Sequence, residues 1–309
     1  MLHRKTAAAG LAAVACVAVA ACSSSGSGNS GSSSNPLAPS TSSSVVVGSA
    51  NFPEDELLAQ IYADALQGAG VKVTTKLNIG AREVYYPEVT KGAISIIPEY
   101  NGALLSTSVD KTSKATSTAE VNAALKAKLP STAEILNSAP AEDKDSITVT
   151  QATAAKYHLK SISDLSPVAK KFVIGGPSEF KTRADGIVGL KDVYGLTFKS
   201  FSPLDESGPI TIAALKSGKV QAADIFTTTP QIVTDKFLSL SDPKNMFAAQ
   251  NVTPLVYKKV ASAKVVSTLN AVSAKLTTEQ LLQMDKQLTI NHASYTTVAS
   301  DFIKQQGLK

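Results

Sequence analysis

The sequence predicts an α/β protein with two lobes, each built on a mainly parallel sheet flanked by helices. Short apolar, β-branched segments alternate with amphipathic helical segments along most of the chain, which is typical of parallel sheets. A β-α-β unit opens this pattern, with strands expected at residues 45–47 and 71–76. Two strands, at residues 147–150 and 252–256, are expected to carry the chain between the lobes and to act as the hinge.

Residues 1–21 have the pattern of a signal peptide. Arg4 and Lys5 precede an apolar run that is shorter than the ~20 residues of a membrane-spanning helix. Residues 22–43 are rich in serine and glycine, which is typical of a flexible linker. Cys22 follows small residues and precedes this linker, which resembles the lipobox of bacterial lipoproteins. That resemblance implies lipidation of Cys22, and an ordinary secretory signal is the alternative.

Composition argues against several classes of function. The formal net charge of +5 becomes +5 − 2 = +3 without Arg4 and Lys5, and it is spread too evenly to indicate a nucleic-acid partner. Both cysteines lie within the first 22 residues, so the folded part has no disulfide and no thiol nucleophile. His158 and His292 are far apart and lack further ligands at metal-binding spacing. We therefore expect no metal and no cofactor.

The motifs of common enzyme classes are missing from the sequence. It has no Gly-x-Ser-x-Gly elbow and no His-Glu metal motif. The carboxylate pairs Glu54/Asp55 and Asp143/Asp145 suit a helix N-terminus and a loop better than acid–base catalysis. We expect a binding protein and not an enzyme. Nothing in the sequence indicates oligomers, so a monomer is expected.

Two loops are expected to form the binding site. Residues 48–52 follow the first strand, and a helix with an apolar face is expected to begin near Pro53. Pro98 to Gly102 follow a strand expected at residues 93–97, with a helix expected to start at Pro98. Ligands of open α/β sheets bind at loops of this kind. Ser49 and Asn51 could instead cap the helix near Pro53.

The remaining elements divide into three groups. In the first lobe, helices are expected at residues 84–91 and 117–129. A strand at 147–149 ends this part of the first lobe. In the second lobe, strands are expected at 172–174, 197–201 and 220–226. They alternate with three helices: one begins near residue 150, one ends near 194, and one covers 208–216. A strand at 251–256 returns to the first lobe, followed by helices at 261–276, 278–288 and 294–305. The expected lobes are therefore residues 44–149 with 252–309, and residues 150–251.

Five short motifs occur in one order along the chain. They are Gly48-Ser49-Ala50-Asn51-Phe52-Pro53-Glu54, Pro98-Glu99-Tyr100-Asn101-Gly102, Thr182-Arg183-Ala184-Asp185-Gly186, Ala214-Leu215-Lys216-Ser217-Gly218 and Phe226-Thr227-Thr228. With them, residues 45–308 resemble the osmoprotectant (glycine betaine, choline, proline betaine) substrate-binding proteins of ABC importers, the ProX/OpuAC-like family. The resemblance implies a type II periplasmic-binding fold that closes over a small solute. It also implies delivery to a permease with its ATPase, at the extracytoplasmic face of a bacterial cell membrane.

The resemblance also implies roles for individual residues. In that family a quaternary ammonium is held among tyrosines by cation–π attraction, and a ligand carboxylate meets an arginine. Tyr100 matches one ring, and Phe226 stands where another tyrosine is usual. Arg183 matches the arginine, although it could instead pair with Asp185 or Glu179.

The sequence departs from the family pattern at three places. Asp145 or Ser146 replaces one aromatic residue of the usual cage, Gln250 stands where another is common, and Ala50 replaces a frequent lysine. Two ligand classes remain open. A cation could be held by Asp145, because a carboxylate attracts it without any ring. The ligand could instead be neutral, either aromatic or polar, and a polar one would bond to side chains of the loops (Ser49, Asn51, Asn101, Thr227 and Gln250). A lipoprotein with a sensing or adhesive role is a further alternative.

Overall fold

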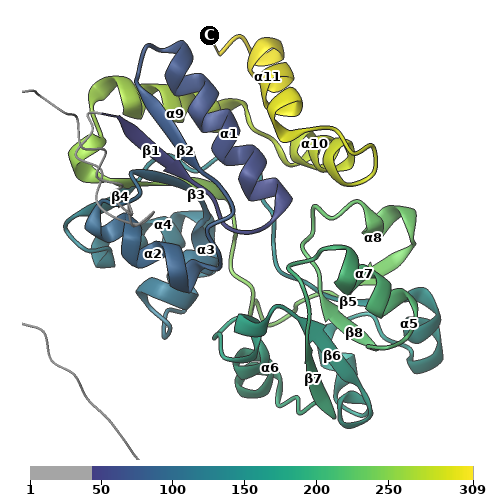
Figure 1. Ribbon diagram of the computed structural model, residues 1–309. Helices are drawn as coiled ribbons and strands as arrows, with labels where there is room; N and C mark the ends of the chain where they lie inside the picture. Colours follow the sequence, from purple (N-terminus) through teal and green to yellow (C-terminus); the bar gives the residue numbers. More distant parts are fainter. Residues whose placement is uncertain (1–43, 309) are drawn as a thin grey trace, which may run out of the picture. The chain divides into compact units, whose positions relative to one another are not determined.

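The computed structural model describes residues 44–308, which form two five-stranded sheets flanked by helices (Figure 1). The expected signal peptide, Cys22 and the linker lie outside the described residues. Among the helices of residues 44–308, none has the length and apolar character that a bilayer-spanning segment needs.

The first sheet has the strand order β2-β1-β3-β10-β4. Its strands are β1 (Val45–Gly48), β2 (Val73–Lys76), β3 (Ile96–Tyr100), β4 (Ala133–Ile135) and β10 (Val252–Tyr257). β1 pairs in parallel with β2 and β3, whereas β10 lies antiparallel between β3 and β4. The sheet is therefore mixed, with β10 as the one strand that runs against the other four.

Helices cover both faces of this first sheet. They are α1 (Pro53–Gly68), α2 (Arg82–Lys91), α3 (Asn101–Leu104), α4 (Thr118–Lys128), α9 (Ala263–Lys275), α10 (Thr278–Thr289) and α11 (Tyr295–Gln306), with a π-helical turn at Leu105–Val109 and a 3₁₀ turn at Lys258–Val260. α1 has Pro53 in its first turn, as expected, and it buries Leu57, Leu58 and Ile61 completely. It packs against α9, α10 and α11, which anchors the C-terminal helices to the opening β-α-β unit.

The second sheet has the strand order β7-β6-β8-β5-β9. Its strands are β5 (Ile147–Thr150), β6 (Val173–Gly176), β7 (Ser200–Pro203), β8 (Ala222–Asp224) and β9 (Phe237–Ser239). The flanking helices are α5 (Gln151–Tyr157), α6 (Ile187–Tyr194), α7 (Pro209–Lys216) and α8 (Gln231–Thr234), with 3₁₀ turns at Ile162–Leu165, Ala169–Lys171 and Ser178–Lys181. β6 pairs in parallel with β7 and β8, whereas β5 is antiparallel to β8 and β9.

The chain passes between the sheets at residues 142–146 and 249–251. These two segments pair with each other, because the Asp143 amide donates to the Gln250 carbonyl oxygen (3.2 Å). The strands expected to be the hinge, β5 and β10, begin directly after these two segments, and each pairs on both sides within its own sheet. Because β5 belongs to the second sheet, a lobe boundary after Val149 would cut through a paired strand.

The helix expected to start at Pro98 begins at Asn101. Pro98, Glu99 and Tyr100 continue β3, because β10 pairs with this strand up to the register Val252–Tyr100. Two further strands were not expected from the sequence, β4 and β9, which have three residues each. The strand expected at 197–201 lies at Ser200–Pro203.

Gly102 explains part of the Pro98-to-Gly102 motif. A Cβ atom at this position would lie 2.3 Å from the carbonyl oxygen of Ala249, in the segment that returns to the first sheet. Only glycine lets α3 and residues 249–251 approach this closely. The neighbouring Asn101 joins the same two segments, because its side-chain oxygen accepts from the amides of Gly102 and Asn251.

We predict that Gly102→Ala lowers the free energy of unfolding by roughly 1–3 kcal/mol, the usual cost of overpacking. The matched control is Gly68→Ala in the exposed last residue of α1, where the same change should be neutral or slightly stabilising. Chemical denaturation of the full chain measures both. Equal effects of the two substitutions would contradict the proposed close approach.

Candidate ligand-binding cavity

A cavity lies where loops from both sheets meet the two crossover segments. It is lined by Ala50, Phe52, Ala81, Arg82, Tyr85, Tyr100, Ala103, Asp143, Asp145, Arg183, Glu206, Phe226 and Gln250. Phe52, Glu206 and Phe226 follow the carboxyl ends of β1, β7 and β8. The loops beyond the carboxyl ends of parallel strands are where α/β sheets bind ligands.

Aromatic rings form one part of the wall. The ring centroids of Phe52 and Tyr100 lie 5.9 Å apart, and those of Phe52 and Phe226 lie 5.3 Å apart at 65°. Phe52 thus connects Tyr100 of the first sheet with Phe226 of the second. The ring of Tyr85, from the first turns of α2, also reaches the cavity. Several ring faces around one space can hold an organic cation by cation–π attraction.

The hydroxyl of Tyr100 is held by a buried polar network. It donates to Oε1 of Glu54 (2.5 Å), and the Thr228 hydroxyl donates to Oε2 of the same carboxyl (2.7 Å). Burial, with the nearby Asp285 carboxyl, raises the pKa of Glu54 well above its usual range. Because Glu54 lies in the first turn of α1 and Thr228 follows β8, this network joins the first-sheet and second-sheet parts of the site.

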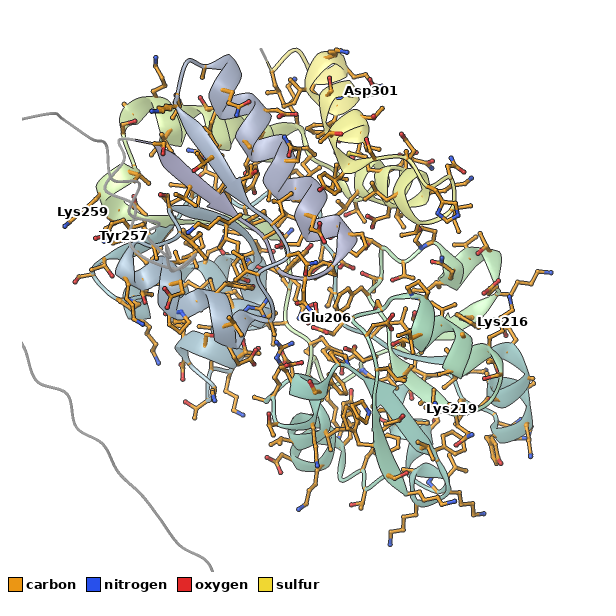
Figure 2. The ribbon with its side chains drawn as sticks, viewed as in Figure 1. Glu206, Lys216, Lys219, Tyr257, Lys259 and Asp301 are labelled. Carbon is orange, nitrogen blue, oxygen red and sulfur yellow. The ribbon has the colours of Figure 1, made fainter. Side chains whose placement is uncertain are left out.

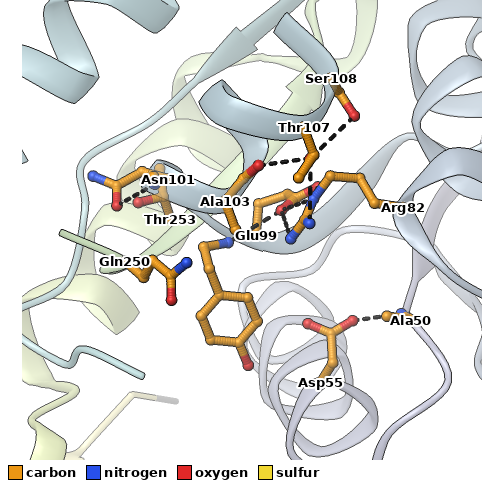
Figure 3. Close-up of polar contacts among 12 residues, drawn as sticks. Ala50, Asp55, Arg82, Glu99, Asn101, Ala103, Thr107, Ser108, Gln250 and Thr253 are labelled. Carbon is orange, nitrogen blue, oxygen red and sulfur yellow. Dashed lines mark hydrogen bonds and ion pairs between the residues drawn. The ribbon is translucent and has the colours of Figure 1, made fainter. Parts of the chain in front are cut away.

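The Arg82 guanidinium is neutralised inside the protein. Its Nε donates to both oxygens of Glu99 at 3.0 Å, and Nη2 lies 2.9 Å from Oε2 (Figure 3). The Tyr85 hydroxyl donates to the same carboxylate at 2.9 Å. Burial acts to lower the pKa of Arg82, but the Glu99 carboxylate outweighs it and raises the pKa. Arg82 therefore lines the cavity with its charge already compensated.

Arg183 lines the cavity but is also paired. Its Nε and Nη2 donate to the two oxygens of Glu83 at 3.0 and 2.9 Å. The sequence had left open a ligand anion, Asp185 or Glu179 as its partner, and the structure shows Glu83 of α2 instead. This bidentate pair occupies the geometry in which an arginine would bind a ligand carboxylate.

Carboxyl groups of the crossover segments form the polar part of the wall. Asp143 accepts from the Thr228 amide (3.0 Å) and the Thr227 hydroxyl (3.2 Å). Burial and the neighbouring Glu54 raise the pKa of Asp143. Asp145 accepts from the side-chain amide of Gln250 at 2.8 Å. Residues 44–308 contain no group of three or more His, Cys, Asp or Glu side chains arranged to hold a metal ion.

Five of the nine residues expected to bind the ligand line this cavity, namely Tyr100, Asp145, Arg183, Phe226 and Gln250. The other four do not line it. The Ser49 hydroxyl, which is fully buried, donates to the Ala50 carbonyl and accepts from the Asn78 amide. Thr227 donates to Asp143 and accepts from the Lys144 amide.

Asn51 and Asn101 also lie outside the cavity wall. Asn101 is fully buried and bonds to Asn122, Gly102 and Asn251. Asn51 is exposed beside a neighbouring groove. Neither Ser49 nor Asn51 caps α1, whose N-cap is Phe52 without a side-chain cap.

Several cavity residues were missed from the sequence, namely Phe52, Arg82, Tyr85, Asp143 and Glu206. Position after a strand is the signal that could have found two of them. Phe52 follows β1, and Glu206 follows β7 after a short loop. Arg82 and Tyr85 reach the cavity from the start of α2, a placement that depends on how this helix packs on the sheet.

The fold and the cavity define a two-lobed solute-binding domain of the periplasmic-binding class. Residues 43–305 match the family described as the substrate binding domain of ABC-type glycine betaine transport systems, so the chain belongs to this family. The resemblance inferred from the motifs is thereby confirmed. Members of this family are binding components of transporters and not enzymes.

Curated relatives and solved structures agree with this assignment. The glycine betaine-binding protein YehZ of Escherichia coli (strain K12) is 28% identical over 279 residues, which cover 86% of this chain and 92% of that protein. A structure of a glycine betaine/carnitine/choline ABC transporter covers 85% of this chain and 99% of its own, with 20% identity and a TM-score of 0.66. A choline-binding protein in complex with choline covers 86% and 89%, with 14% identity and a TM-score of 0.62. At these identities the two structures show the shared fold.

We predict that Glu99→Gln destabilises the protein by roughly 3–5 kcal/mol, because it leaves the buried Arg82 without its counter-charge. The control is Glu88→Gln, which breaks an exposed pair with Lys91 and should cost at most about 1 kcal/mol. Chemical denaturation of both variants measures the difference. A small effect of Glu99→Gln would mean that Arg82 finds another partner or reaches water.

The stability of the protein should also depend on the buried Asp285 of α10. Burial raises the pKa of Asp285 from 3.8 to about 7, so the folded state binds this proton more tightly than the unfolded state. The resulting stability is fully present below about pH 4 and is lost as the pH rises to about 7. Its upper bound is on the order of 4 kcal/mol.

We therefore predict that Asp285→Asn flattens the fall of the melting temperature between about pH 5 and pH 8. Asp301→Asn, on the exposed face of α11 (Figure 2), is the control and should keep the wild-type profile. Identical profiles for Asp285→Asn and the wild type would show that Asp285 is ionised throughout this range.

Proposed function

We propose that this chain is the solute-binding component of an ABC importer and that it captures a small quaternary ammonium compound in the cavity. The observation that carries the proposal is the contact of Phe52 with both Tyr100 and Phe226, which brings aromatic rings from both sheets together in the cavity wall. Relatives that bind glycine betaine, and neighbours that bind choline, support this ligand class. The rings would hold the trimethylammonium group by cation–π attraction.

The remaining predicted residues have two proposed roles. Asp145, Arg183 and Gln250 line the cavity and would contact the ligand directly. Ser49, Asn101 and Thr227 would position the wall, because their side chains bond to the loops that carry the lining residues. Asn51 would lie at the rim of the site. A neutral polar ligand has less support, because the side chains of Ser49, Asn101 and Thr227 already form hydrogen bonds within the protein.

The proposed lobes follow the two sheets. Residues 44–141 with 252–309 would form one lobe and residues 147–249 the other, with residues 142–146 and 250–251 as the hinge. The hydrogen bond between Asp143 and Gln250 supports this division, because it holds the two crossover segments side by side, where both can bend together. We expect the protein to act as a monomer.

We further propose that lipidated Cys22 anchors the chain at the extracytoplasmic face of a bacterial membrane, with residues 22–43 as the tether. The Ser/Gly-rich composition of these residues and the small residues before Cys22 support the anchor. Membership of an importer family supports an extracytoplasmic position and a permease with its ATPase as partner. A sensing or adhesive role is not favoured by this membership.

The function is tested by the melting temperature of the full chain with choline, glycine betaine, carnitine and a neutral polyol. A ligand that binds the folded state raises the melting temperature by mass action. We expect upward shifts with quaternary ammonium compounds and none with the polyol. A shift with the polyol alone would refute the proposed ligand class.

The contribution of the rings is tested at Phe226. We predict that Phe226→Leu, which keeps apolar bulk and removes the ring face, weakens binding of a quaternary ammonium compound by roughly 2- to 30-fold. Phe226→Tyr keeps the ring and should bind like the wild type. Titration calorimetry measures both affinities, and equal affinities of the two variants would exclude a cation–π role for this ring.

A further inference from the structure

A cluster of carboxyl groups lies on the second-sheet side of the cavity. Asp145 and Glu206 line the cavity directly, and the latter is labelled in Figure 2. Asp185, before α6, and Asp224, the last residue of β8, are buried and interact electrostatically with Asp145. We call Asp145, Asp185, Asp224 and Glu206 the carboxyl cluster. It brings together residues from four separate segments of the chain.

The carboxyl cluster is short of hydrogen-bond donors. Asp224 is only 1% exposed, and within residues 44–308 neither of its carboxylate oxygens has a hydrogen-bond partner. Asp185 accepts from the Ser106 hydroxyl at 2.8 Å through one oxygen, but its other oxygen has no partner there. When one of them carries a proton, the Asp224 and Asp145 carboxyls can bond to each other. A buried carboxylate without donors is costly unless a positive charge compensates it.

The two guanidinium groups of the wall act on these carboxyls only from a distance, because each is already paired with a carboxylate outside the cluster. Arg82 is paired with Glu99 and Arg183 with Glu83, and in both pairs the nitrogen–oxygen distances are 2.9–3.0 Å. Apart from these two paired arginines, the acidic and basic side chains among the lining residues are the carboxyls Asp143, Asp145 and Glu206. The cavity wall therefore combines carboxyl groups with aromatic rings, and each arginine among its lining residues already has a carboxylate partner.

We propose that the carboxyl cluster is a recognition site for positive charge, so that this protein takes a net-cationic solute in preference to a zwitterion. This inference rests on the proposed function, in which the cavity is the ligand site. A cation without a carboxylate would place its charge toward Asp145 and Glu206 and compensate Asp185 and Asp224 behind them. A betaine would bring a carboxylate into the same small space, where each arginine already has its partner.

Protons are expected to take the place of the cation in the free protein. Burial raises the pKa of Asp185 to about 6 and that of Glu206 to about 7, and it raises the pKa of Asp224 as well. A cation favours the ionised carboxyls, so its binding should release protons and become tighter as the pH rises from about 5.5 to 8. The charged groups that act on these three carboxyls are Arg82, Arg183, Asp145, Glu179 and the members of the cluster themselves.

The test uses two ligands that share the trimethylammonium group and differ in charge. Choline is a cation and glycine betaine a zwitterion, and ethanolamine serves as a cation without methyl groups. On the full chain, titration calorimetry at about pH 8 should give choline at least about 10-fold tighter binding than glycine betaine. Repeating the choline titration in two buffers of different ionisation enthalpy should show proton release, with weaker binding at about pH 5.5.

Two isosteric variants assign the effect to the cluster. Asp145→Asn and Asp224→Asn should each weaken choline binding and reduce its preference over glycine betaine by about 10-fold. Asp192→Asn, an exposed carboxylate of α6, should leave both affinities unchanged. Asp224→Asn keeps the shape of the buried side chain and removes its charge. The melting temperature of this variant shows whether it still folds.

The possible outcomes separate the two proposals. Tighter binding of glycine betaine than of choline to the wild type would overturn this inference and leave the proposed function standing. A preference for choline that survives both variants would also overturn it. Binding of ethanolamine without either trimethylammonium compound would refute the proposed ligand class and support the cation site. If choline, glycine betaine and ethanolamine all fail to bind, the inference is overturned.

Discussion

The buried ion pair between Arg82 and Glu99 organises the first-sheet wall of the cavity. One carboxylate at the end of β3 receives hydrogen bonds from the guanidinium and the hydroxyl of Tyr85, which both come from α2. It also accepts from the amide of Tyr100 (3.1 Å), the next residue of the strand. The pair therefore fixes α2 against β3 and places two of the aromatic rings at once. Its charges satisfy each other, so the wall contains an arginine that has little charge left for a ligand.

The second-sheet side of the cavity has the opposite balance. Its arginine, Arg183, is neutralised by Glu83, whereas its carboxyls have few donors, and Asp224 has none among residues 44–308. A site with paired arginines and unpaired carboxyls differs from one built for a carboxylate-bearing solute, although both belong to the same fold.

Much of the fold could be predicted from the sequence, because apolar periodicity is a local signal. The opening β-α-β unit, the alternation of strands and helices, and the three C-terminal helices agree with the pattern. The errors concern pairing between distant segments. Pro98 to Tyr100 continue β3 because β10 lies beside them, and the three-residue strands β4 and β9 exist only through their partners. No local pattern records such a partner.

The order of the five motifs and the alternation of strands and helices along the chain were enough to indicate the family and the two-lobed fold. The sequence also pointed to five lining residues, because the family resemblance and the departures from it directed attention to Tyr100, Asp145, Arg183, Phe226 and Gln250. The pairing of the charged groups in the site, in contrast, follows from how the folded chain brings distant residues together. Arg82 is paired with Glu99, and Arg183 is paired with Glu83, which lies 100 residues away in the sequence. Asp224 has no hydrogen-bond donor near its carboxylate among residues 44–308. Electrostatic pairing acts through space, so a pattern along the chain does not contain it.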